Sequence, residues 1–234
     1  MSLLSYLVDP ANWPGADGIA VRLGQHLIYT GASLAIAFVL SLLLGTVVGH
    51  FRVGNLALVG TTNATRAIPT LGLLVLVVTL LGTGIGPVVL ALTVLAIPPI
   101  LNATATGIRE ADPGAVQAAR ALGMNPWQVI TRIELPLAVP LIVSGLRSAS
   151  LQVVSTATVA ALAASGGLGR LVIDGQRSGA SGYPEMFAGA VLVALLAIVL
   201  DVAFGTTGLL LRRKMRPSRR STELTGAQLQ AELS

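Results

Sequence analysis

The stretch that decides the fold is residues 186–211, MFAGAVLVALLAIVLDVAFGTTGLLL. Apolar side chains fill this run, and Asp201 is its only charged residue. A helix of about 20 predominantly apolar residues is long enough to cross the hydrocarbon core of a bilayer. The stretch therefore predicts a helix that spans a membrane.

The composition of the whole chain agrees with this prediction. Hydrophobic residues make up 53% of the 234 residues, charged residues 11%, and the mean hydropathy is +0.80. Soluble domains carry about 25% charged residues, so this chain cannot cover a water-facing surface. Cysteine is absent and only two histidines are present, too few for a metal site. We therefore expect an all-α integral membrane protein without a bound metal.

Three further apolar runs reach the length of a span, at residues 27–48, 87–108 and 137–160. A fifth run, residues 69–81, is too short unless it extends back through Leu56. That extension contains polar residues, so this helix cannot face lipid on every side and we expect it to pack inside the bundle. The sequence predicts about five transmembrane helices.

The positions of the basic residues predict the orientation, because cytoplasmic segments are enriched in Lys and Arg. A basic cluster at residues 212–220 directly follows the last span, and placing it inside also puts the loop at residues 110–136 in the cytoplasm. We therefore expect a multi-pass protein of the cell membrane with its N-terminus outside and its C-terminus inside. Residues 1–24 would be an extracellular segment, 25–211 the transmembrane domain and 212–234 a cytoplasmic tail.

The long loop at residues 110–136 contains start and stop signals for two short helices. Asp112 is an N-cap acceptor followed by proline at the first helical position, and Gly123 is a suitable residue after the last turn. Asn125 and Pro126 repeat the start signal, and we expect the second helix to end before Pro136. One apolar face of that helix would be formed by Trp127, Ile130 and Ile133.

These residues resemble the EAA loop of ABC importer permeases. The matching positions are Gln117, Ala118, Ala119, Gly123, Ile133, Leu135 and Pro136, with Trp127 between them. In that family the loop docks in a cleft of a separate ATPase subunit, and the resemblance implies a type I permease with a two-helix coupling loop. The sequence departs from the motif where Gln117 stands in place of glutamate. The alternative is an ordinary helix–turn–helix connection between two spans.

The resemblance extends to one branch of this family, the permeases for glycine betaine, carnitine and choline. The segments that carry it are Arg66-Ala67-Ile68-Pro69, residues 97–102, residues 157–161 and the glycine-rich turn at residues 166–169. It implies a permease subunit for a quaternary-amine osmoprotectant such as these or proline betaine. Methionine-import permeases share the loop and the Arg-x-Ile-Pro pattern, so another small solute stays open.

Energy for transport has to come from another chain. The sequence has no G-x-x-x-x-G-K-[S/T] phosphate loop and its only lysine is Lys214, so we expect no enzymatic activity and no bound cofactor, with ATP and Mg²⁺ on a partner. The resemblance implies an ABC ATPase, a second permease chain (identical or related) and an extracellular solute-binding protein as partners in the bilayer, and no nucleic acid. The alternatives are an ATP-independent channel or secondary carrier, and an anchoring subunit.

Polar side chains within the spans are the candidates for a translocation path. The set consists of Ser144, Ser148, Gln152 and Ser155 on one helical face, with Thr158 nearby, and of Asn63 and Arg66 before the short run. Hydrogen bonding between helices is an equally weighted alternative.

Two charged residues lie deep inside predicted spans, Arg147 and Asp201. Each is about 16 Å from the inner end of its helix, so we predict an intramembrane ion pair between them. Pro98 and Pro99 predict a kink in the span at residues 87–108. Gly45 and Gly49 form a small-xxx-small pattern, which is typical of close helix contacts.

Overall fold

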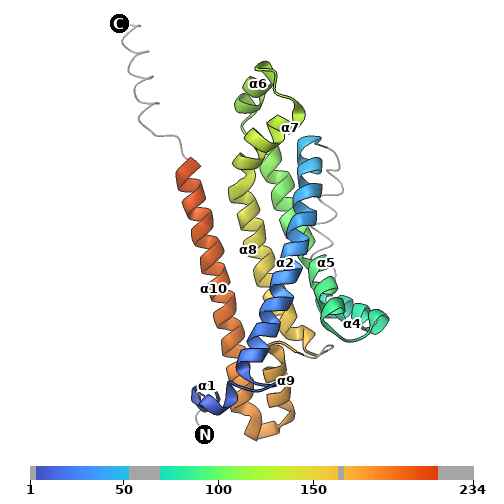
Figure 1. The fold of residues 1–234 in the computed structure, drawn as a ribbon, viewed down its shortest axis with the longest axis vertical. Coiled ribbons are helices and arrows are strands. Elements are labelled where there is room, and N and C mark those ends of the chain that lie inside the picture. Colours follow the sequence, from blue (N-terminus) through green and yellow to red (C-terminus); the bar gives the residue numbers. More distant parts are fainter. Residues whose placement is uncertain (1–3, 53–68, 163–165, 216–234) are drawn as a thin grey trace.

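The computed structural model describes residues 4–52, 69–162 and 166–215, and every regular element in these residues is helical. Four long helices run along the long axis of the molecule: α2 (Ile19–His50), α5 (Ile85–Arg109), α8 (Leu135–Ala160) and α10 (Tyr183–Met215) (Figure 1). Each is long and apolar enough to cross a membrane. The predicted all-α membrane fold is confirmed.

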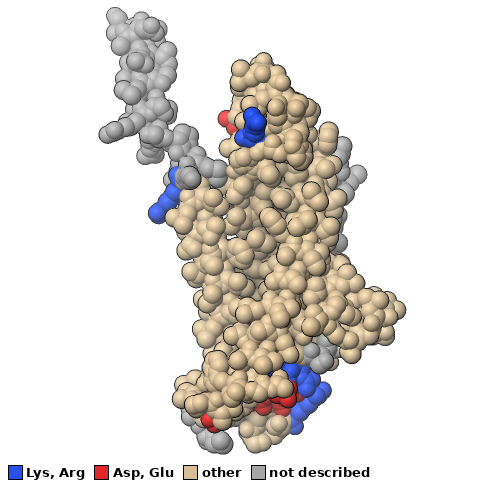
Figure 2. Space-filling model, in the orientation of Figure 1, with Lys and Arg blue, Asp and Glu red and all other residues tan. Residues whose placement is uncertain are grey.

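The shorter elements gather at the two ends of this bundle (Figure 1). At one end stand α6 (Pro113–Ala121) and α7 (Pro126–Val129); at the other stand α1 (Ser5–Val8) and α9 (Gly169–Arg177). Two 3₁₀ helices, Pro10–Asn12 and Gly179–Gly182, follow α1 and α9 along the chain. On the face shown in Figure 2, the charged side chains of the described residues lie toward the two ends and leave an uncharged belt between them.

The helices α2 and α5 pack against each other in the same direction. Two buried serines of α2 donate hydrogen bonds to backbone carbonyls of α5: Ser33 to Val89 at 3.2 Å and Ser41 to Ile97 at 3.1 Å. Later positions on α2 bond to later positions on α5, so the two helices are parallel. Buried hydroxyls that find carbonyl partners in this way avoid the cost of an unsatisfied polar group.

The parallel arrangement bears on the number of spans. The chain between His50 and Ile85 has to return from one end of the bundle to the other, and α4 (Thr70–Leu81) is the described part of this connection. Its 12 residues form about 18 Å of helix, too short to cross a bilayer alone. The remainder of the fifth run, including Asn63 and Arg66, lies outside the described residues. The count of five spans stays a prediction, which the direction of α5 supports.

The predicted contact at Gly45 and Gly49 is confirmed as the place where α2 comes closest to α5. A Cβ atom added at Gly45 would lie 2.7 Å from the Cβ of Thr104, and one added at Gly49 would lie 2.8 Å from the Cβ of Ile108. Real Cβ atoms do not approach each other so closely, so the absence of side chains here sets the distance between the helices.

Burial differs strongly among the four long helices. In the most apolar window of α5, 56% of residues are buried, against 11% in that of α10. Helix α5 is thus the centre of the bundle, contacting α2, α4 and α8, while α10 contacts mainly α8 and α9. Pro98 and Pro99 stand inside α5 without ending it, and the kink stays a prediction. Most of α10 is left to face lipid or another chain.

We expect Gly45→Ala to destabilise the folded protein by about 1–3 kcal/mol, because its methyl group overlaps Thr104 and the helices have to separate. The matched control is Gly31→Ala on the same helix, where nothing lies within 4 Å of the added methyl. Thermal unfolding in detergent, followed by circular dichroism, measures both. Equal unfolding temperatures for the two variants would contradict the close contact.

Candidate functional site

The first helix of the loop has the ends that the sequence predicts. The Asp112 carboxylate accepts a hydrogen bond from the Gly114 amide at 2.8 Å, and Pro113 occupies the first turn. At the other end Gly123 has a φ of +78°, and the Met124 amide donates to the Ala119 carbonyl at 3.1 Å. This is a Schellman ending, which satisfies carbonyls that the helix leaves unpaired.

The second helix begins as predicted but does not end where the sequence suggests. Asn125 and Gln128 form a capping box, with both hydrogen bonds at 2.9 Å. After α7 the chain forms a π-helical turn, Ile130–Glu134, which leads directly into α8. The predicted end before Pro136 is therefore wrong.

The π turn explains how the helix continues through Pro136. The Leu135 amide donates to the Ile130 carbonyl, five residues back instead of four. Proline lacks an amide hydrogen and clashes with the carbonyl of the preceding α-helical turn, and a wider π turn directly before it changes that pairing. The second helix of the loop is consequently fused to a membrane-spanning helix without a break.

Two large apolar side chains of the loop project into solvent. Leu122 is 81% exposed and Trp127 is 70% exposed. Leu122 is the last residue before Gly123, and Trp127 lies in the first turn of α7. Both side chains belong to the loop at residues 110–136, outside the long apolar helices α2, α5, α8 and α10.

Some of the remaining residues of the predicted loop site are exposed like Leu122 and Trp127, and the others pack inside the loop. Gln117, Ala118, Gly123 and Pro136 are exposed, whereas Ile133 and Leu135 are partly buried and Ala119 is buried. The predicted apolar face is wrong in part, because Ile130 is buried and Trp127 points outward. Sequence reasoning missed Leu122, which is the C-cap residue of α6.

The base of the loop is fixed to α2 by buried polar contacts that the sequence did not reveal. His50 Nδ1 lies 2.7 Å from a carboxylate oxygen of Glu134, and each side chain is 7% exposed. Arg109, the last residue of α5, donates a hydrogen bond to the Val48 carbonyl at 3.3 Å. The π turn and the ends of α2 and α5 thus form one connected junction.

The polar residues predicted along α8 lie on a face that is not packed against α5. Ser144, Ser148 and Ser155 are exposed, while Gln152 and Thr158 are partly buried. The hydroxyl of Ser155 donates to the Gln152 carbonyl at 3.0 Å and that of Thr158 to the Val154 carbonyl at 3.0 Å. These two hydroxyl bonds stay within α8 and join no second helix. Asn63 and Arg66, the other path candidates, lie outside the described residues.

The predicted ion pair between Arg147 and Asp201 is present. Nε and Nη2 of Arg147 each donate to one carboxylate oxygen of Asp201, both at 2.6 Å. This bidentate geometry is the strongest form of an arginine–carboxylate contact, and it joins α8 to α10. The side chains remain 44% and 33% exposed, at a depth where lipid offers no hydrogen bonds. One side of the pair is therefore left open in the single chain.

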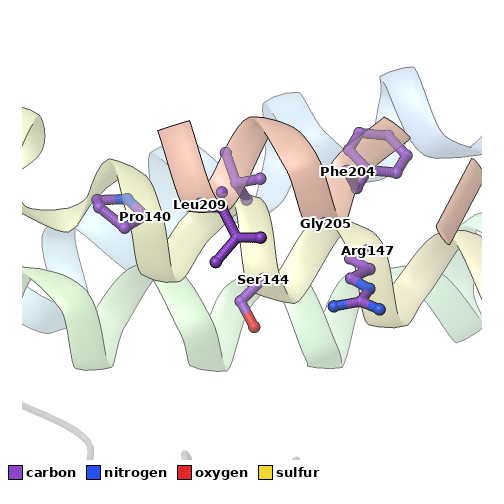
Figure 3. A pocket seen from close by; sticks show the side chains of 8 residues that line it. Pro140, Ser144, Arg147, Phe204, Gly205 and Leu209 are labelled. Carbon is purple, nitrogen blue, oxygen red and sulfur yellow. The ribbon is translucent and has the colours of Figure 1, made fainter. Parts of the chain in front are cut away.

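A cavity of about 180 Å³ lies beside this pair, between α8 and α10. Figure 3 shows Ser144 and Arg147 on α8, with Phe204, Gly205 and Leu209 on α10. A Cβ atom added at Gly205 would lie 3.4 Å from the guanidinium carbon of Arg147. Ser144 and Arg147, from the polar face of α8, therefore line the space between α8 and α10.

Comparison with known proteins adds a family match over most of the chain. The family described as "Binding-protein-dependent transport system inner membrane component" matches residues 34–216. A glycine betaine/carnitine/choline transport system permease protein of Bacillus subtilis is 30% identical over 84% of this chain and 88% of its own length. An osmoprotectant import permease protein of Salmonella typhimurium is 31% identical over 86% and 93%.

A solved structure supports the same relationship. A chain of the MetNI methionine ABC transporter, in an inward-facing conformation, superposes with a TM-score of 0.69 and 25% identity. The match covers 82% of this chain and 95% of that one. The helical arrangement described above is therefore shared with a transporter of the ABC class.

We expect Asp201→Ala to lower both the yield of folded protein from membranes and its unfolding temperature, because Arg147 would be left without its partner inside the bilayer. The double variant Arg147→Met/Asp201→Leu should recover much of the loss, since it removes both charges at similar volume. Size-exclusion chromatography and thermal unfolding measure both quantities. A single variant as stable as the wild type would show that the pair does not hold α8 to α10.

Proposed function

Because the chain belongs to the family of binding-protein-dependent transport system inner membrane components, we propose that it forms half of the path by which a quaternary-amine osmoprotectant enters the cell. The observation that carries this proposal is the loop of α6 and α7, which exposes Leu122 at the end of α6 and Trp127 on the helix that continues into a membrane span. This arrangement suits a subunit that is moved by another protein.

The loop is the proposed docking element for an ABC ATPase subunit. Leu122 and Trp127 would enter a cleft on the ATPase, and the exposed Ala118 would let its surface approach α6 closely. ATP and Mg²⁺ would be held by that partner, since this sequence has no phosphate-binding loop of its own. The chain itself is a transport subunit.

The proposed orientation puts the docking loop and the tail in the cytoplasm. The C-terminal end of α10 points toward the same end of the bundle as α6 (Figure 1), so Arg213 and the loop lie on one side. Enrichment of arginine on that side agrees with the positive-inside rule. Residues before α2, together with α9, would then face an extracellular solute-binding protein.

A second permease chain would complete the path. The polar face of α8 and the open side of the Arg147–Asp201 pair are exposed in a single chain, and most of α10 is unburied. In the proposed cycle, ATP binding brings the two docking loops together and opens the path outward, the binding protein delivers solute, and hydrolysis restores the inward-facing state.

The proposed solute class rests on the relatives of about 30% identity, which are named for glycine betaine, carnitine and choline. Quaternary ammonium groups are recognised most tightly by aromatic side chains, yet only 4% of this chain is aromatic. Selection of the solute would therefore fall mainly to the binding protein. Methionine is the second candidate, favoured by the likeness to a methionine transporter.

Uptake in reconstituted vesicles tests this proposal. With the ATPase, the second permease chain and the binding protein present, labelled glycine betaine or choline should accumulate only when ATP is supplied, and methionine should not. ATP-dependent uptake of methionine alone would favour the second candidate. Uptake by this chain without any ATPase would instead indicate a channel or secondary carrier.

We expect Leu122→Glu to weaken ATPase binding about 30-fold, the effect of losing roughly 2 kcal/mol at a central contact. We choose Leu122 over the neighbouring Gly123 for this test. Gly123 has a positive φ, so a substitution of Gly123 would also strain the turn. The control is Val8→Glu, which changes an equally exposed side chain at the opposite end of the molecule. Co-purification and ATPase titration measure binding, and equal affinity for both variants would refute docking at α6.

A further inference from the structure

A second cavity lies beneath α6, where the C-terminal ends of α2 and α5 meet the π turn. Its volume is about 180 Å³. Its walls carry the side chains of three arginines, which come from three different elements: Arg52 after α2, Arg109 at the end of α5 and Arg120 on α6. Convergence of three guanidinium groups on one small space gives the cavity a strong positive potential.

The described lining of the cavity contains little negative charge beside Arg52 and Arg120. Among the described lining residues Glu134 is the only carboxylate, and it is already bound to His50 at 2.7 Å. The other two carboxylates of the loop, Glu110 and Asp112, are exposed and do not line the cavity, and Asp112 caps α6. Within the described parts of the chain, neither Arg52 nor Arg120 forms an ion pair.

The backbone at Arg52 supports a specific role for this side chain. Its φ is +53°, and it is the one residue other than glycine with a positive φ among the described residues. Glycine is the usual residue at this position after a helix, because a side chain makes the left-handed conformation unfavourable. An arginine is kept here in a conformation that places it on the cavity wall.

The missing negative charge coincides with the departure of this sequence from the EAA motif. Gln117 lines the cavity on the same face of α6 as Pro113 and Arg120. The motif has a glutamate at this position, and its carboxylate would balance one of the neighbouring guanidinium groups. In this chain a neutral amide takes its place, so the side chain at this position supplies no negative charge to the neighbouring arginines.

We propose that this cavity binds a phosphate-type oxyanion. Arginine recognises phosphate oxygens through paired N–H donors, and several arginines from different elements are the usual way of holding such a group. The cavity lies where two apolar helices end, so the phosphate belongs to an anionic lipid or is a free ion from the cytoplasm. Its oxygens join α6 to the ends of α2 and α5. This site is separate from the solute path, and it shares Gln117 with the exposed surface of the loop.

The test uses the full chain with two arms that distinguish the sources. In one arm, equilibrium dialysis measures binding of labelled inorganic phosphate to the purified chain in a neutral detergent. In the other, native mass spectrometry counts phosphatidylglycerol molecules kept by the chain after release from nanodiscs of mixed phosphatidylglycerol and phosphatidylcholine. Neither measurement depends on uptake, so failure here would leave the transport proposal untouched.

The informative variant is Gln117→Glu, which restores the motif carboxylate without removing an arginine. We expect it to weaken binding about tenfold in whichever arm shows binding, as a like charge is brought to the anion. Arg120→Gln should do the same. The matched control is Arg132→Gln, because Arg132 is an exposed arginine of the π turn that does not line the cavity. Thermal unfolding confirms that each variant is folded, and Arg52→Gln replaces any that is not.

Saturable phosphate binding that is lost in Gln117→Glu identifies the free ion, and retention of phosphatidylglycerol that is lost in the same variant identifies the lipid. The proposal is overturned if neither ligand binds in preference to phosphatidylcholine. It is also overturned if Gln117→Glu binds the ligand as well as the wild type and the control Arg132→Gln do.

Discussion

The close, parallel packing of α2 against α5 is the constraint on which the rest of the structure depends. In a bilayer no water is available to satisfy stray polar groups, so buried serines on α2 bond to carbonyls of α5, and glycines on α2 let the two backbones meet. Helices held in this way cannot slide along each other without losing both kinds of contact. The contacts between α2 and α5 therefore fix the register of these two helices.

The ends of α2 and α5 meet because of this register. His50 and Arg109 come to the same level, and each makes a polar contact across the junction, to Glu134 and to the Val48 carbonyl. The π turn is attached at this point, and it carries α6 and α7 on one side and α8 on the other. The exposed surface of Leu122 and Trp127 thus rests on the most firmly connected end of the bundle. A partner that moves this surface has to move the junction as well.

Much of the fold could be predicted from the sequence because its signals are local. Apolar length predicts the four long helices, caps and proline predict the start of α6 and α7, and the helical rise predicts that Arg147 meets Asp201. The start of α2 is earlier than expected, at Ile19, since buried polar residues such as Arg22 and His26 interrupt the apolar pattern without ending the helix.

The rest depends on contacts that no short stretch of sequence encodes. The bond from His50 to Glu134 joins residues 84 positions apart, and neither residue lies in a recognisable pattern. Continuation through Pro136 depends on one hydrogen bond that shifts by a single residue, which the usual stop signals do not describe. The cavity beneath α6 needs three arginines from separate elements, and only the packing of α2 and α5 brings them together.

The unbroken helix from Pro126 to Ala160 has a mechanical consequence. Its 35 residues make a rod of about 52 Å, with Trp127 near one tip and Ser155 near the other. Close to its middle, Gly145 rests on the backbone of Pro99, where an added Cβ would lie 2.9 Å from the carbonyl oxygen. One end of this rod is held to α2 through Glu134 and His50, and its middle packs against α5. A force applied at Trp127 is therefore carried into α2 and α5 together with α8, and the three helices move as one unit.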